Sequence, residues 1–422
     1  MSSFLLNPYT LVIRRPSIFR ALLNEISFHP KKDKLIHCGD ICTKGPFDGS
    51  LAVLSYMSSN NVSGVRGNHD QVIIEWRAWM EWIRGLYRGQ GRDWLEMLHK
   101  RWDEAVRRHE EGGGRDDDDE DEIDERKWMK KQRKMAKRWE KKFWKKVPEN
   151  WEMFGEDYQI ARKMTKADYD YLVSLPLVLH IPSEHTFVVH AGILPYDPTR
   201  PITSERQPLA HPPFIGSVHS PPRSSFEFFS AQKKEKHTLP LLREAQEISI
   251  LQDIKKNRDP WVLQNMRSVL KGGEITKDSN DGTPWTELWN SVMPRCSGYD
   301  DLELSKNRDK SLPCQPSTVV YGHAASRDLD LNRWTKGLDT GCVYGRRMTV
   351  LILDAPHKHR SSSTEGHDDE YEDIEREDVR FDDPGTTLMK TAFGDNGNAH
   401  IVSVSCHKHR EQKPHNGKDK SP

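Results

Sequence analysis

Four short apolar runs along the chain each lead into a polar side chain that can bind a metal ion. The runs occupy residues 34–37, 62–66, 186–190 and 318–321, and the polar side chains are Asp40, Asn68, His190 and His323. Apolar, β-branched runs that break at glycine predict buried strands ending in loops. Residues 47–58 have a helical pattern, which gives the strand-helix-strand order of an α/β sheet. We therefore expect the four side chains to converge where strands end.

These four side chains form a donor set that transition metals prefer. One carboxylate, one amide and two imidazoles suit zinc, manganese or iron. A glycine followed by Asp or His at a strand end is most often a simple turn, so each motif alone is weak evidence. Their common position after four predicted strands favours a metal site with Asp40, Asn68, His190 and His323 as ligands.

The remaining pattern predicts helices and strands around this site. A helix begins at Pro16-Ser17 and carries Ile18, Phe19, Leu22, Leu23 and Ile26 on one face, whereas residues 1–16 show no clear periodicity. Further helices are predicted at 164–174 and 241–270, and further strands at 177–180, 349–353 and 400–405.

The composition indicates one large domain with long solvated segments. The chain has 422 residues, of which 35% are hydrophobic and 30% charged, and its formal net charge is zero. Such a chain can bury a core, and its neutral balance indicates no specific nucleic-acid partner. We predict a domain over 17–406 and disordered segments at 197–240, 355–392 and 407–422.

Residues 71–165 are predicted to form a helical, charge-rich insertion in this domain. Nine of the thirteen tryptophans lie between Trp76 and Trp151. The simplest interpretation is that they attach amphipathic helices to the domain, with Trp76, Trp79 and Trp82 packed against it. Seven consecutive acids at 116–122 follow three glycines and predict a disordered spacer.

A basic amphipathic helix is predicted within the insertion, over residues 126–146. This segment holds twelve Lys or Arg and a single acid, Glu140, and its apolar residues Trp128, Met135, Trp139 and Phe143 recur at helical spacing. Its basic face either contacts a polyanion or membrane surface, or is a solvated face that balances the acidic run. The solvated face is the simpler interpretation.

The cysteine pattern and hydropathy bear on the compartment. The six cysteines show no CxxC pair and no spacing typical of a disulfide framework, so we expect reduced thiols. Apolar runs are too short to span a membrane, and the N-terminus lacks the apolar segment of a signal peptide. These observations predict a soluble, cytoplasmic protein.

Several motifs around the metal site resemble one known family. They are Gly39-Asp40 with Lys44-Gly45-Pro46, Arg66-Gly67-Asn68-His69-Asp70, His190-Ala191-Gly192, Gly322-His323, and Gly337-Leu338-Asp339-Thr340-Gly341-Cys342. The chain thereby resembles the calcineurin-like metallophosphoesterases over residues 17–96, 150–196 and 315–406. Within that group it is similar to the PPP-type Ser/Thr phosphatases and symmetrical diadenosine tetraphosphatases, and most similar to fungal zinc-dependent endopolyphosphatases. The resemblance implies a β-sandwich of mixed sheets flanked by helices.

The resemblance also implies hydrolysis of phosphoester or phosphoanhydride bonds at two metal ions. Asp40 corresponds to the carboxylate that bridges the metals, and Asn68, His190 and His323 to further ligands of one metal. His69 matches the general acid for the leaving oxygen. Phosphate oxygens would be held by Lys44, Arg66 and Arg346. Polyphosphate is the expected substrate, with phosphoproteins and dinucleoside polyphosphates as alternatives, and a vacuolar location is implied by resemblance alone.

Two departures from the family pattern divide the functional hypotheses. Thr43 and Lys44 stand where PPP-type phosphatases have an Asp-Arg pair, which disfavours protein phosphatase activity. The family's first strand ends in Asp-x-His, yet residues 1–24 contain no Asp, Glu or His, so the sequence supports one metal. The chain is then a hydrolase, or a weak or inactive relative that binds phosphate compounds, or a sequence whose N-terminus differs from that of the true protein.

Overall fold

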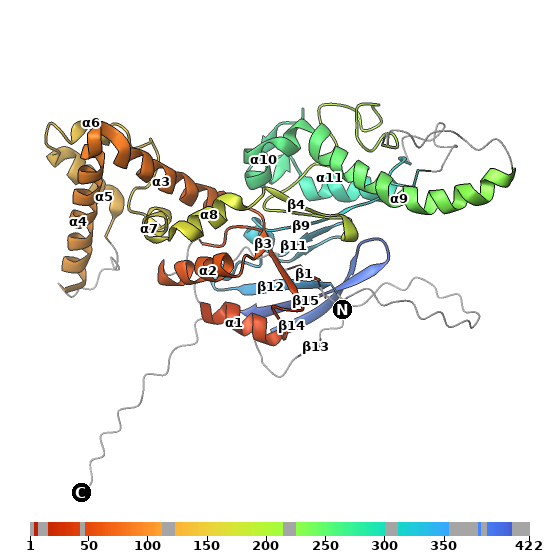
Figure 1. Cartoon of the computed structure of the whole chain (residues 1–422), viewed down its shortest axis with the longest axis horizontal. Coiled ribbons are helices and arrows are strands. Elements are labelled where there is room, and N and C mark those ends of the chain that lie inside the picture. Colours follow the sequence, from red (N-terminus) through yellow and green to blue (C-terminus); the bar gives the residue numbers. More distant parts are fainter. Residues whose placement is uncertain are drawn as a thin grey trace, which may run out of the picture.

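The computed structural model describes residues 4–6, 16–42, 47–111, 123–213, 225–299, 311–353, 379–380 and 386–406. Two β-sheets are stacked at its centre (Figure 1). The larger sheet has seven strands, in the order β13-β14-β15-β12-β1-β2-β3. Its strands are β13 (Val379–Arg380), β14 (Thr386–Phe393), β15 (Gly397–Ser405), β12 (Arg347–Leu353), β1 (Phe4–Leu6), β2 (Lys34–His37) and β3 (Ser63–Gly64).

The second sheet has five strands, in the order β10-β11-β9-β5-β4. They are β10 (Asp330–Leu331), β11 (Thr335–Gly337), β9 (Thr318–Tyr321), β5 (Thr186–Val189) and β4 (Val178–Ile181). Both sheets are mixed: β1, β2 and β3 run parallel in one, and β11, β9 and β5 in the other. A small third sheet joins β6 (Ser268–Val269) to β7 (Ile275–Thr276) and β8 (Thr283–Pro284).

Alternation along the strands explains the stacking of the two sheets. In β5, Val188 belongs to an apolar cluster that also contains Ile36 of β2 and Val320 of β9, so these side chains lie between the sheets. Their neighbours Phe187 and Val319 belong to a separate cluster on the outer face of the five-stranded sheet. Successive side chains of a strand point to opposite faces, so both faces of these strands are buried. The predicted sandwich of mixed sheets is confirmed.

Helices cover the outer faces of both sheets (Figure 1). Helices α1 (Pro16–Glu25) and α2 (Phe47–Ser59) pack their apolar residues with Leu35 of β2. Helices α10 (Pro260–Asn265) and α11 (Trp285–Val292) share an apolar cluster with Phe187 of β5. The helices predicted after Pro16 and at 47–58 are thus confirmed.

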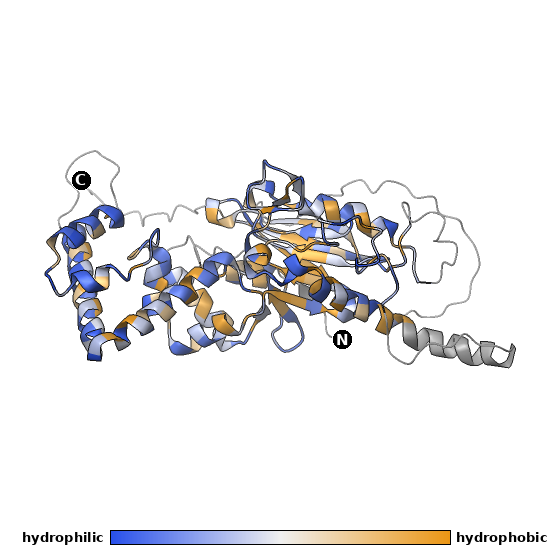
Figure 2. Ribbon diagram, turned by 90° about the horizontal axis from the view of Figure 1, so that it is seen from above, coloured by the Kyte–Doolittle hydropathy of each residue, from blue (hydrophilic) through white to orange (hydrophobic). Residues whose placement is uncertain are grey.

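The predicted insertion consists of helices that extend to one side of the sheets (Figure 1). They are α3 (Asn68–Gly85), α4 (Gln90–Glu111), α5 (Glu125–Met135), α6 (Lys141–Trp144) and α7 (Glu156–Lys163), and the separate helix predicted at 164–174 follows as α8 (Lys166–Ser174). Trp76 anchors them, since its ring lies 5.3 Å from Trp79, 4.6 Å from Trp151 and 4.8 Å from Tyr158. The expectation for Trp82 is wrong, because 48% of it is exposed. Figure 2 shows that this end of the molecule, with α4 to α6, is rich in hydrophilic residues.

The predicted basic helix over 126–146 is interrupted. Helix α5 ends at Met135, Ala136 has extended backbone angles, and α6 begins at Lys141. After the break, Phe143 stacks on Trp94 of α4, and the chain buries Glu140 beside Arg101 at 3.5 Å. Met135 and Trp139 are exposed instead of lying on the buried face that we predicted. Packing against α4 therefore overrides the regular helical pattern.

Three further expectations about the chain are corrected by the structure. Within 197–240, residues from 225 onward belong to helix α9 (Ser225–Asp253), and the helix predicted over 241–270 ends at Asp253 before α10 and β6. Within 355–392, residues 386–392 lie in β14, which pairs with β15 along its whole length. Within 1–16, residues 4–6 form β1 between β12 and β2. The acidic run at 116–122 and the tail at 407–422 lie outside the described residues.

The expectation of reduced cysteines is wrong for four of the six. Cys296 pairs with Cys314, and Cys342 with Cys406, whereas Cys38 and Cys42 are free and buried. The paired cysteines are 18 and 64 residues apart in sequence, so only the folded chain brings them together. Among the described helices, none is long and apolar enough to cross a membrane.

Candidate metal centre

The backbones of the loops after β2 and β3 are in close contact at Gly39 and Gly67, which is possible because neither residue has a side chain. Gly39 has a φ of +86°, and a Cβ at Gly67 would lie 2.0 Å from Oδ1 of Asp40. A side chain at either position would strain the backbone or displace the Asp40 carboxylate. The two glycines therefore set where Asp40 lies relative to helix α3.

Asp70 holds the same two loops together. Its buried carboxylate accepts hydrogen bonds from the backbone N–H groups of Asp40 at 2.8 Å, Ile41 at 3.0 Å and Gly67 at 2.9 Å. Burial, with a smaller contribution from the charge of Asp40, raises the pKa of Asp70 to about 6. The carboxylate thus positions the backbone that carries Asp40 rather than facing the cluster itself.

Asp40, His190 and His323 form a cluster whose ligand atoms lie within 4.8 Å of one another. Asp40 follows β2, His190 follows β5 and His323 follows β9. Oδ2 of Asp40 is 3.3 Å from Nε2 of His190, and Oδ1 of Asn68, at the start of α3, is 2.9 Å from the same nitrogen. The structure therefore brings together all four ligands predicted from the sequence, from the carboxyl ends of strands in both sheets.

The hydrogen bonding of His190 shows that this cluster fits a metal ion. Nδ1 of His190 lies 2.7 Å from the carbonyl oxygen of Cys38, so Nδ1 carries the proton and donates it. Nε2 then faces the oxygens of Asp40 and Asn68, and the neighbouring charge of Asp40 raises the pKa of His190 despite its burial. The two oxygens and Nε2 thus surround a position that favours positive charge, which a proton on Nε2 provides in the absence of a metal. A divalent metal ion bound there would take the place of that proton.

The pKa values in the cluster agree with ligand roles. Burial, and then the neighbouring His190, lowers the pKa of His323 to about 3. Burial alone would raise the pKa of Asp40, but His190 outweighs it and holds the pKa below its ordinary value. At neutral pH His323 is therefore uncharged and Asp40 is ionised, which are the forms that bind a metal.

His69 lies beside the cluster in the first turn of α3. Its backbone N–H donates to Oδ1 of Asp40 at 2.9 Å, and its Nδ1 lies 3.8 Å from Oδ2 of Asp157, at the start of α7. The side chain of His69 is 29% exposed, so a substrate can reach it. The N-terminus of an 18-residue helix here also favours an anion such as phosphate.

A family model for the calcineurin-like phosphoesterases matches residues 15–247, which is more than half of the chain. The chain belongs to the calcineurin-like phosphoesterase family. Members of this family depend on metal ions, in agreement with the cluster of Asp40, His190 and His323.

Two individual proteins are similar to the chain. Over 82 residues it is 33% identical to serine/threonine-protein phosphatase 1 of Salmonella typhimurium, a match that covers 19% of this chain and 36% of that protein. The chain thus spans little more than a third of the length of that curated relative. It can also be superposed on a crystal structure described as a candidate diadenosine tetraphosphatase, with a TM-score of 0.39 and 18% sequence identity. The superposition covers 83% of this chain and 89% of the other. That overlap is too loose to support an argument.

The three predicted phosphate-binding residues are placed differently. Lys44 lies outside the described residues. The guanidinium of Arg66 donates to the carbonyl oxygens of Val173 at 2.6 Å and Leu175 at 3.0 Å, so it ties the loop to the C-terminal end of α8. Arg346 donates to the carbonyl oxygen of Ala325. Their phosphate contacts remain predictions.

Asp339 is a buried acid near the site to which the sequence assigned no role. It follows β11, and burial raises its pKa to about 6, although the N–H of Gly341 donates to its carboxylate. The charge of Asp40 also contributes to this rise in pKa. Asp339 follows a short strand that ends at Gly337, much as Asp40 follows a strand and Gly39, and this position could have marked it as a candidate.

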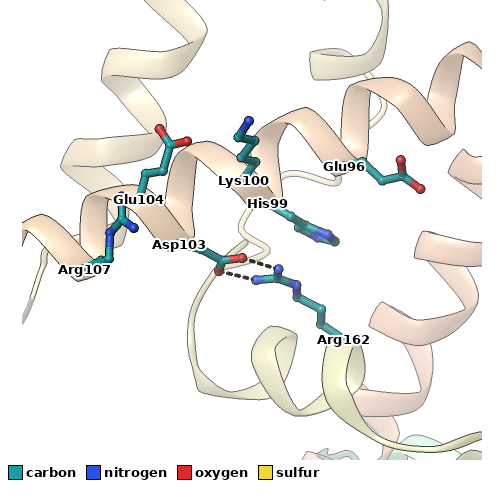
Figure 3. A pocket seen from close by; sticks show the side chains of 7 residues that line it. All are labelled: Glu96, His99, Lys100, Asp103, Glu104, Arg107 and Arg162. Atoms are coloured by element: carbon teal, nitrogen blue, oxygen red, sulfur yellow. Dashed lines mark hydrogen bonds and ion pairs between the residues drawn. The ribbon is translucent and has the colours of Figure 1, made fainter.

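A pocket of about 570 Å³ lies away from the cluster, between α4 and α7. Figure 3 shows Arg162 directed toward Asp103, whereas Lys100 and Glu104 point away from this pair, and Arg162 donates to both carboxylate oxygens of Asp103 at 2.7 and 2.6 Å. Nε2 of His99 is 2.6 Å from the hydroxyl of Tyr158. Asp103, Arg162 and His99 thus have partners within the protein, and we interpret this pocket as a charged surface between helices.

Proposed function

We propose that the protein is a metal-dependent hydrolase of phosphoester or phosphoanhydride bonds. The convergence of Asp40, Asn68, His190 and His323 carries this proposal, because a carboxylate, an amide oxygen and two imidazoles meet beside a helix N-terminus. Family membership supports the reaction class. The alternative is a protein that binds phosphate compounds without hydrolysing them, because residues 1–24 contain no Asp-x-His motif to hold a second metal ion.

The chain's own residues have separate tasks in this reaction. Asp40, Asn68, His190 and His323 hold the metal, which when bound polarises the phosphoryl group and lowers the pKa of water. The N-terminal N–H groups of α3 attract the phosphate. His69 donates a proton from its imidazole to the leaving oxygen. Asp70 holds the loops after β2 and β3 together through its hydrogen bonds to the N–H groups of Asp40 and Gly67.

The substrate is a finer proposal. Hydrolysis of polyphosphate is supported by the resemblance to endopolyphosphatases and by the exposed lysines of the segment at 126–146. Hydrolysis of phosphoproteins is supported by the similarity to serine/threonine-protein phosphatase 1. The two disulfides favour an oxidising compartment over the cytosol, which supports a location such as the vacuole.

The reaction class is tested with p-nitrophenyl phosphate. We expect protein loaded with manganese or zinc to hydrolyse this ester, and protein stripped by a chelator to lose activity by about a hundredfold or more. Colorimetric release of p-nitrophenol gives the rate, and inactive, fully loaded protein would contradict the proposal.

Replacing Asp157 with asparagine tests whether this residue positions His69. The loss of its charge 3.8 Å from Nδ1 leaves the imidazole less well oriented and less able to donate a proton. We expect kcat for phenyl phosphate, which has a poor leaving group, to fall about tenfold. The kcat for p-nitrophenyl phosphate, whose leaving group needs little protonation, should fall far less.

Asp170→Asn is the matched control, since Asp170 is an exposed acid on α8 that pairs with Lys166. It should leave the ratio of the two kcat values unchanged. An equal loss on both substrates in Asp157→Asn would show a structural role for Asp157 instead.

A further inference from the structure

A second pocket, of about 390 Å³, opens beside His69 between α3 and α7. Its walls come from the body of α3, the segment at 150–155 and the first residues of α7. His69 lines this pocket and also donates its backbone N–H to Asp40. The pocket therefore adjoins the metal cluster on the side of the predicted general acid.

The aromatic wall of this pocket is rigid. Trp76 is 2% exposed, and its ring meets that of Trp151 edge-on at 4.6 Å. Trp76 is further held by Trp79 and Tyr158, so the wall is part of the core of the insertion. Trp76 thus fixes the position of Trp151, which is partly exposed and presents the indole surface that a ligand can contact.

The remaining lining is strongly acidic. Its carboxylates are Glu75, Glu152, Glu156 and Asp157, and the described residues that line it include no Lys or Arg. Glu75 accepts a hydrogen bond from the neutral amide of Gln71 at 2.9 Å, so that contact leaves its charge uncompensated. Glu152 forms an ion pair with Arg126. Carboxylates gathered around one hollow attract cations and repel additional phosphates.

The acids at the start of α7 also have a structural role, because negative side chains stabilise a helix N-terminus. Glu156 and Asp157 would be expected there in any helix. That role does not explain why Glu75 of α3 and the tryptophans line the same pocket as His69. The combination of aromatic wall, negative charge and general acid describes a binding pocket.

We propose that this pocket receives the leaving group of the substrate and selects a leaving group that carries a positive charge. The proposal rests on the proposed function, since it takes His69 as the group that protonates the leaving oxygen. A cationic group bound against the Trp151 indole and the carboxylates gains both cation–π and charge attraction. A polyphosphate chain in the same pocket would place phosphates against carboxylates, so this inference disfavours polyphosphate among the substrates proposed above.

Two esters of equal shape test the proposal: phosphocholine, and its uncharged isostere 3,3-dimethylbutyl phosphate. We expect wild-type protein to have a kcat/KM for phosphocholine about tenfold above that for the neutral ester. In the double variant Glu75→Gln and Glu156→Gln this ratio should fall to about one, and kcat/KM for tripolyphosphate should rise. Glu81→Gln is the control, since Glu81 lies on α3 and pairs with Arg77. It should keep the wild-type ratio.

Binding measured without turnover separates the two proposals. Saturation-transfer NMR should show phosphocholine bound more strongly than its isostere by metal-free wild-type protein, and this difference should be lost in the double variant. Equal binding and equal kcat/KM for the two esters, or a higher kcat/KM for tripolyphosphate, would overturn the pocket assignment even if p-nitrophenyl phosphate is hydrolysed. Charge-selective binding without hydrolysis of any ester would keep the pocket and overturn the proposed function.

Discussion

Replacing Asp40 with asparagine is expected to lower the affinity of the protein for its metal at least tenfold, and hydrolysis by about a thousandfold. The amide keeps the shape of the side chain but removes the negative charge that faces Nε2 of His190 at 3.3 Å. His190→Ala removes the partner ligand and should weaken metal binding to a similar degree. Elemental analysis of dialysed protein and competition with a chelator measure the metal directly.

Asp48→Asn is the matched control, because Asp48 is an exposed acid in the first turn of α2. It should retain metal and activity. Circular dichroism checks that each variant is folded. Asp40→Asn protein that keeps its full metal content would mean that the cluster is not the metal site, and the proposed chemistry would lose its basis.

Removal of the disulfide between Cys342 and Cys406 is expected to lower the free energy of unfolding by about 4 kcal/mol. The bond closes a segment of 64 residues, and such a cross-link restricts the unfolded chain in proportion to the logarithm of that length. It also joins the loop after Asp339 to the end of β15. Urea unfolding of the double variant Cys342→Ser and Cys406→Ser measures the change.

The second disulfide provides an internal comparison. Cys296 and Cys314 are 18 residues apart, so their replacement should cost less, about 3 kcal/mol. Reduction of both disulfides in the wild-type protein should lower the free energy of unfolding by more than replacement of either cysteine pair alone. A stability that neither reduction nor replacement changes would show that the thiols are unpaired in solution.

The metal cluster could be predicted from the sequence because its signal is local. Each ligand follows a short buried strand, and in the sheets the carboxyl ends of β2, β3, β5 and β9 bring those positions together. The strand-helix-strand order also predicted α2 correctly, whereas the mixed sheets were expected from the family resemblance. Alternation of apolar side chains needs no knowledge of distant residues, so the sequence by itself contains this part of the fold.

Local periodicity was a poor guide where packing between distant segments decides the structure. The segment at 126–146 breaks because Phe143 meets Trp94 of α4, and no pattern within the segment contains that contact. Strand β14 lies at the end of a segment predicted to be disordered, and its own residues include no acid. It pairs with β15 along its whole length, a contact that the composition of the surrounding segment did not reveal.

The partners of charged and sulfur-containing side chains were decided by the tertiary structure alone. Arg66 lies in the loop that carries the ligands, yet it donates to carbonyl oxygens of α8, more than 100 residues away. The cysteines pair across 18 and 64 residues, and Asp157 approaches His69 from α7. Sequence determines which groups are available and which strands carry them. The fold decides which groups meet, because loop closure joins residues whose separation along the chain has no signature of its own.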